Sequence, residues 1–139
     1  MTDHAKQNAA AWMQTICDYE SGREALARDA ETVTIDGETF DDNDALRERI
    51  QELPLSVQVR GTWHTPGDDQ SAREPVEFEI LLSTGGPALR IRGGLNEYNE
   101  PCQPRLQYQD WGTPWTDYRL NAEEERALDA FCGLFYFGE

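Results

Sequence analysis

The stretch PVEFEILLSTGGPALRIRG (residues 75–93) alternates apolar and charged side chains on both sides of a Thr-Gly-Gly-Pro segment. Such alternation is typical of a β-strand with one buried face, and glycine beside proline marks a turn. Folding the stretch into a hairpin places Glu77 and Glu79 on one open face. Arg90 and Arg92 share that face, where an opposite-charge pair across strands contributes about 0.2–1 kcal/mol. The pattern therefore predicts an antiparallel sheet that is covered on its other face.

Two further strands of this sheet are predicted from the same alternation. In residues 55–63 the apolar positions expected to face inward are Leu55, Val57, Val59 and Trp63. In residues 105–109 the inward positions are Leu106 and Tyr108. Gly93 and Gly94 follow the hairpin, and we interpret them as bulge residues because no helix with a following lysine is attached to form a phosphate loop.

A second hairpin and a helix are predicted before these strands. Asp36 and Gly37 lie between β-forming residues, and Asp-Gly is a strong signal for a two-residue hairpin turn. The acidic run at residues 41–44 then offers N-caps to a helix that Pro54 ends. The buried side of that helix is expected to consist of Ala45, Leu46, Ile50 and Leu53.

Helices are also predicted at both ends of the chain. Residues 3–19 carry one apolar stripe, and the capping-box pattern from Ser21 to Glu24 predicts a second short helix through about Ala30. Asn121 is expected to cap the last helix. The residues expected to cover the sheet from that helix are Leu128, Phe131, Cys132 and Phe135.

Length and composition favour one domain that spans residues 1–139. We predict an α+β fold, with an antiparallel sheet of about four to six strands and with N-terminal helices and a C-terminal helix packed on one face. No apolar stretch is long enough to span a bilayer. The N-terminal residues lack the pattern of a signal peptide, and the three cysteines form no C-x-x-C pair. These features predict a protein of the reducing cytoplasm.

The chain carries a formal charge of −15, with 27 acidic and 12 basic residues. Because nucleic-acid affinity depends on neutralising phosphates, this charge argues against direct binding of nucleic acid, and anionic membranes are disfavoured for the same reason. A basic protein surface is the favoured partner. A solubility device, an adaptation to salt and the imitation of a polyanion are three alternative explanations of the charge, and the sequence leaves the oligomeric state open.

More than half of the excess negative charge lies in residues 18–52, where twelve acidic residues and four arginines give −8. Clustering suits a surface that meets a cationic groove, whereas acidic helix caps and exposed faces are the plainer explanation. The residues predicted to bind a partner are Asp36, Glu38, Asp41, Asp42, Asp44, Glu48 and Glu52.

Residues 110–118 form an aromatic segment with Trp111 and Trp115 around glycine and proline. The two tryptophans are second-choice anchors for a partner. The alternative is that the segment folds back as a lid on the open end of the core.

Signals for catalysis are weak, and we expect no enzyme, no cofactor and no metal site. The only histidines are His4 and His64, which are too few for the usual zinc sites. Cys102, expected in a loop flanked by Pro101 and Pro104, could pair with His64 as a nucleophile, but only their coexistence supports this.

Three strings carry a resemblance to known proteins: ILLSTGGPALRIRG (80–93), QDWGTPWTDY (109–118) and FYFGE (135–139). They resemble a group of small acidic proteins of bacteriophages, prophages and plasmids, over roughly the last 60 residues. The resemblance transfers no catalytic residue. It implies a context in which small acidic proteins disarm host defence by imitating DNA or by plugging basic channels.

The leading hypothesis is a non-enzymatic protein that binds a basic surface of a host nucleic-acid-handling complex and inhibits restriction or CRISPR immunity by local DNA mimicry. One alternative is a small enzyme or ligand-binding domain that uses the segment from Trp111 to Trp115 as a pocket wall. The other is a phage structural or assembly protein whose strand edge pairs with another copy.

Overall fold

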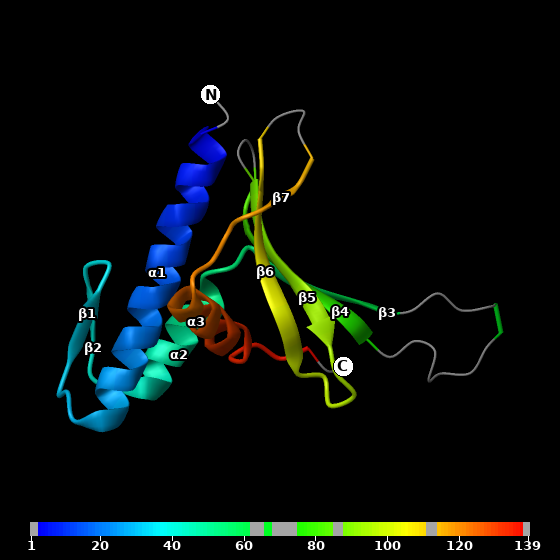
Figure 1. The fold of residues 1–139 in the computed structure, drawn as a ribbon. Coiled ribbons are helices and arrows are strands. Elements are labelled where there is room, and N and C mark those ends of the chain that lie inside the picture. The colour runs from blue at the N-terminus through cyan, green and yellow to red at the C-terminus, as the bar shows by residue number, and fades with distance from the viewer. Residues whose placement is uncertain (1–2, 62–65, 68–74, 85–87, 111–113, 138–139) are drawn as a thin grey trace.

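The computed structural model of the chain describes residues 3–61, 66–67, 75–84, 88–110 and 114–137. It has an α+β fold with a helical layer on one face of an antiparallel sheet, as predicted (Figure 1). The elements are α1 (Asp3–Arg28), β1 (Val33–Ile35), β2 (Glu38–Phe40), α2 (Asn43–Glu52), β3 (Ser56–Gly61), β4 (Pro75–Ser83), β5 (Ala88–Leu95), β6 (Pro101–Gln109), β7 (Thr116–Asp117) and α3 (Ala122–Cys132).

The main sheet has five antiparallel strands in the order β3-β4-β5-β6-β7. The predicted hairpin of β4 and β5 is confirmed, because Glu79 lies opposite Arg92 and accepts a hydrogen bond from Arg90 Nη1 at 3.1 Å. Glu77 instead pairs with Arg60, which the sequence did not indicate. A register shift between Arg92 and Gly94 confirms the predicted bulge.

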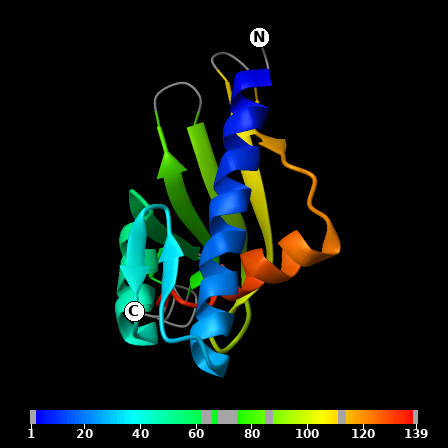
Figure 2. The same ribbon diagram turned by 90° about the vertical axis from the view of Figure 1, so that its left-hand side faces the viewer.

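The covered face of the sheet forms one side of the core. Phe78, Ile80, Leu89, Ile91 and Leu106 are buried there, against α1 and α3. The opposing helical residues are Ala9, Met13 and Ile16 of α1 and Leu128, Phe131 and Cys132 of α3. Figure 2 shows α1 running the length of the molecule in front of the sheet. The alternation that predicted the strands therefore arises because one face of the sheet packs against the helices and the other face is open.

Helix α1 is continuous, so the prediction of a separate helix starting at Ser21 was wrong. Tyr19 and Glu20 are buried just before the expected break, and Arg23 Nη1 donates to both oxygens of Glu20 at 2.5 and 2.6 Å. Burial raises the pKa of Glu20, and Arg23 opposes that effect. Gly22 allows β1 to pack closely against α1, because a Cβ at this position would lie 2.6 Å from Ile35 Cδ1. A single glycine within a helix costs about 1 kcal/mol, which the long helix tolerates.

The predicted β1–β2 hairpin is confirmed, with Asp36 and Gly37 at φ values of 56° and 83° in its turn. Helix α2 is confirmed as well, and the Asp42 side chain accepts a hydrogen bond from the backbone N–H of Asp44. Leu46 and Ile50 are buried, but Ala45 is exposed, contrary to expectation. The hairpin and α2 both pack on α1, and in Figure 1 the hairpin lies on the side of that helix away from the sheet.

Strand β3 lies at the edge of the sheet and is poorly covered. Val57 and Val59 face the helical side, opposite Ile80 and Phe78 of β4, as predicted. However, they are 38% and 46% exposed, and Leu55 is 60% exposed. The reason is the position of the helices, since α1 and α3 pack on β5 and β6. Trp63 lies outside the described residues.

Strand β6 begins earlier than expected, so Cys102 lies in a strand and not in a loop. Its pairing with β5 runs through the bulge, where Gly94 lies opposite Cys102. The added strand β7 pairs with β6, with Asp117 opposite Gln107. No described helix has both the length and the apolar character that a membrane span requires.

The predicted start of α3 is confirmed as a reciprocal capping box. Glu124 N–H donates to the Asn121 side chain at 2.8 Å, and Asn121 N–H donates to the Glu124 carboxylate at 3.0 Å. After the helix, Phe137 returns to the core with its ring centroid 4.7 Å from that of Phe78. The expected burial of Phe135 is only partial.

Replacing Asn121 by Ala is expected to lower the free energy of unfolding by about 1 kcal/mol, because the backbone N–H of Glu124 loses its acceptor, the Asn121 side chain. Urea denaturation followed by circular dichroism measures the change. The matched control is Asn8→Ala, at an exposed position inside α1, where alanine is the better helix former. A loss of equal size in both variants would contradict the capping role.

Candidate functional site

The seven predicted acidic residues are all exposed, and they lie on the β1–β2 hairpin, on α2 and in the connection between these two elements, which contact one another. We call this set the acidic surface: Asp36, Glu38, Asp41, Asp42, Asp44, Glu48 and Glu52. Two of these residues lie on the β1–β2 hairpin and three lie on α2, and the remaining two lie in the connection between them. Figure 2 shows the hairpin in front of α2, on the same side of the molecule.

The helical part of the acidic surface is a regular stripe. Asp44, Glu48 and Glu52 follow one another at intervals of four residues, which places them on one side of α2. Leu46 and Ile50 occupy the buried side of the same helix. The burial of the apolar side therefore fixes the direction in which the three carboxylates point.

Arg49 joins the two elements of the acidic surface. Its Nε donates to Glu38 Oε1 at 2.8 Å, and its Nη1 lies 3.9 Å from Glu52 Oε1. The hydrogen bond with Glu38 raises the pKa of Arg49. Within the described part of the chain, no ion pair involves the other five carboxylates. The surface is thus held together by one cation and keeps most of its negative charge.

Trp115 lies on a different side of the molecule from the acidic surface. Its ring stacks under Arg90, whose Cζ is 3.9 Å from the ring centroid. Arg90 belongs to the open face of the sheet, whereas the hairpin and α2 lie on the helical side of the sheet, where both contact α1 (Figure 1). The structure therefore does not bring Trp115 together with the predicted carboxylates. Trp111 lies outside the described residues.

The open face of the sheet carries four of the eleven arginines of the chain. Its four arginines are Arg60, Arg90, Arg92 and Arg105, and its three carboxylates are Glu77, Glu79 and Asp117. Burial lowers the pKa of Arg90, and the neighbouring Arg92 lowers it further. The alternation of β4 and β5 predicted this face with its Glu77, Glu79, Arg90 and Arg92, whereas the contributions of Arg60, Arg105 and Asp117 were not predicted.

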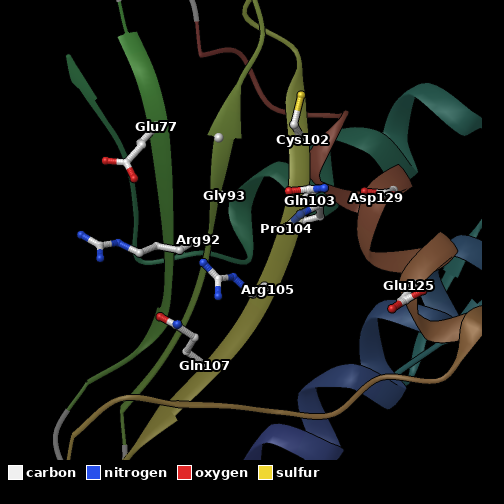
Figure 3. A pocket seen from close by; sticks show the side chains of 11 residues that line it. Glu77, Arg92, Gly93, Cys102, Gln103, Pro104, Arg105, Gln107, Glu125 and Asp129 are labelled. Atoms are coloured by element: carbon white, nitrogen blue, oxygen red, sulfur yellow. The ribbon is translucent and has the colours of Figure 1, made fainter. Parts of the chain in front are cut away.

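A groove of about 750 Å³ opens at the β5–β6 bulge (Figure 3). Arg92 and Arg105 lie directly opposite one another in the register of β5 and β6 and both line it. Its acidic lining residues are Glu77 of β4 and Glu125 and Asp129 of α3. The groove is therefore lined by both signs of charge, which does not select an anion or a cation.

No arrangement for nucleophilic catalysis is assembled from the described residues. Cys102 lines the groove, but its thiol contacts the Glu100 carbonyl at 3.6 Å, and His64 lies outside the described residues. Burial raises the pKa of the Cys132 thiol, which keeps it protonated. Among the described side chains, no cluster of three or more His, Cys, Asp or Glu could hold a metal ion.

Sequence reasoning found the carboxylates but missed the residue that organises them. Arg49 and Glu38 are eleven positions apart and lie on different elements, so no local spacing indicates their contact. No family model matches the chain, and the searches of curated proteins and of solved structures found no match either.

Proposed function

We propose that the protein is a non-enzymatic inhibitor that binds a basic surface of a host nucleic-acid-handling complex, such as a restriction or CRISPR complex. The acidic surface would occupy the site that such a complex uses for the phosphates of DNA. Binding of this kind competes with nucleic acid and leaves the inhibitor chemically unchanged. A source in a bacteriophage, prophage or plasmid, as the sequence resemblance implies, would supply the context for a target in host defence.

One observation carries the proposal: seven exposed carboxylates lie on a single hairpin–helix unit that contains two arginines, Arg47 and Arg49. Of these two, only Arg49 forms an ion pair among the described residues, with Glu38 and Glu52. A charge spread evenly for solubility would not need this separation. The arginines of the sheet lie on the face that points away from the unit, so they do not neutralise it directly. A basic groove would meet a rigid surface whose charges are already in place, which lowers the ordering cost of association.

The first test is competition with DNA. Purified restriction enzymes and CRISPR effector complexes are incubated with the protein, and cleavage of target DNA is measured with increasing DNA or salt. Inhibition of one of them is expected to fall with added DNA and to fall steeply with salt, because exposed charges are screened. Inhibition that persists unchanged at high salt would contradict a phosphate-like contact.

The second test reverses the charge of Asp41, Asp44 and Glu48 to Lys. These three positions leave the Asp42 cap and the Glu38–Arg49 contact intact, so the fold is expected to persist. Binding is expected to weaken by at least about a hundredfold, because three close charge pairs are each replaced by repulsion. The matched control reverses Glu97, Glu125 and Asp129, which are exposed elsewhere and change the net charge equally. Equal loss in both triple variants would show that only net charge matters and would contradict the site.

A further inference from the structure

The main sheet has two edges, and they differ in what they offer. The β7 edge is only two residues long, and short edge strands resist pairing. The β3 edge spans Ser56–Gly61, and within the described residues β3 pairs only with β4. One row of backbone N–H and C=O groups of β3 therefore faces outward, and such a row is a template for another strand.

On the helical face, the side chains of this edge are apolar, whereas natural edges are usually protected by charge or proline. Five large hydrophobic side chains are exposed in the described residues, and three of them are Leu55, Val57 and Val59. Val57 and Val59 continue the buried face of β4 beyond the cover of the helices, opposite Ile80 and Phe78. A strand added outside β3 would extend this face and lower the exposure of the two valines to water.

The charge of the segment indicates which partner fits. Residues 53–67 contain no Asp or Glu, in a chain that has 27 of them. Two copies of a chain with a net charge of −15 repel one another, and they can meet most easily through a segment without carboxylates. The acidic surface lies on the hairpin and α2, outside this segment.

The sequence of β3 is also complementary to itself. In an antiparallel pair centred on Gln58, Val57 lies opposite Val59 of the second copy, and Gln58 lies opposite Gln58 of the second copy. Ser56 then lies opposite Arg60 of the second copy, so no like charges face one another across the seam. A twofold axis at Gln58 makes every contact twice, as in the commonest class of symmetric dimers.

We propose that two copies of this chain pair through β3, antiparallel and in register at Gln58, to form a continuous ten-stranded sheet. The occupant of the edge is the same strand of a second copy, and its backbone groups satisfy the outward row of N–H and C=O groups. The dimer does not depend on the acidic surface, so failure of the proposed inhibition would not contradict this pairing, and failure of the pairing would not contradict the inhibition.

Sedimentation velocity of the full chain, at two concentrations about a hundredfold apart, is the first measurement. A species of twice 15.8 kDa is expected at the higher concentration. Val59→Lys is expected to return it to the monomer, because a charge on the seam cannot be buried without a partner. Tyr98→Lys is the matched control, since Tyr98 is 74% exposed, far from β3 in sequence, and receives the same charge. A wild-type monomer at both concentrations, or a dimer unaffected by Val59→Lys, would overturn the proposal.

The register is tested by cross-linking in a chain whose Cys17 and Cys102 are replaced by Ser. Gln58→Cys is expected to form a covalent dimer on mild oxidation, because directly opposite residues have Cα atoms about 4.5–5.5 Å apart. Ser56→Cys is the matched control on the same face of the strand. In the proposed register, residue 56 of one copy lies opposite residue 60 of the other. The two residues 56 are therefore offset by four positions along the strands, about 13 Å, which is beyond the reach of a disulfide. Circular dichroism confirms that each variant is folded, and cross-linking through Ser56→Cys in preference to Gln58→Cys would overturn the register.

Discussion

Replacing Phe131 by Ala is expected to lower the free energy of unfolding by about 3–5 kcal/mol, the usual range for removing a buried aromatic side chain. Phe131 is completely buried in α3, where its ring lies 5.3 Å from that of Phe135. It belongs to the core that α1 and α3 form with the sheet. Small domains have a free energy of unfolding of only about 5–15 kcal/mol, so the variant is expected to be partly unfolded or close to unfolding.

Tyr136→Ala is the control for that prediction. Tyr136 lies five residues further along and is 78% exposed, so its removal is expected to change stability by less than about 0.5 kcal/mol. Both variants are measured by urea denaturation, with the slope of the transition compared as a check that unfolding remains cooperative. A loss at Tyr136 as large as that at Phe131 would mean that the core is assigned wrongly.

The second large effect is expected at Gly93 in β5. A Cβ at this position would lie 2.7 Å from Phe78 Cε1 and 2.9 Å from the backbone oxygen of Cys102. Rotation of Phe78 could relieve only the first contact, and Phe78 is itself packed on Phe137. The second contact would require β6 to move. Gly93→Ala is therefore expected to cost about 1–3 kcal/mol, the range for overpacking a close-packed core.

The neighbouring glycine provides the comparison. A Cβ on Gly94 would have the Val76 carbonyl oxygen at 3.8 Å as its nearest neighbour, which is an ordinary contact. Gly94→Ala is expected to leave the midpoint of thermal unfolding almost unchanged, while Gly93→Ala lowers it by several degrees. If the two variants melted together, close approach of β5 and β6 would not be the reason for glycine at position 93.

Most of the fold could be predicted because its signals are local. The β4–β5 hairpin follows from alternation, and the β1–β2 turn follows from Asp36 and Gly37, whose φ values are both positive. The start of α3 follows from the capping pattern at Asn121. In each case a few adjacent residues contain the physical cause of the structure.

The parts that could not be predicted depend on packing between distant residues. The continuity of α1 depends on burial of Glu20 and on the approach of Ile35 to Gly22, neither of which the capping pattern at Ser21 includes. The exposure of Val57 depends on where the helices lie on the sheet. The same holds for the candidate site. The exposure of its carboxylates could be predicted from the sequence, whereas the contact between Arg49 and Glu38 could be seen only in the three-dimensional structure.

The arginines on the open face of the sheet give the molecule an electric dipole moment. The acidic surface, with seven carboxylates, lies on the helical side of the sheet, and the open face, with four arginines and three carboxylates, lies on the other side. A cationic target exerts a torque on such a molecule before contact, which turns the hairpin and α2 toward it. The arginines of the open face would then raise the rate of productive encounter by orienting the molecule, although they touch no partner.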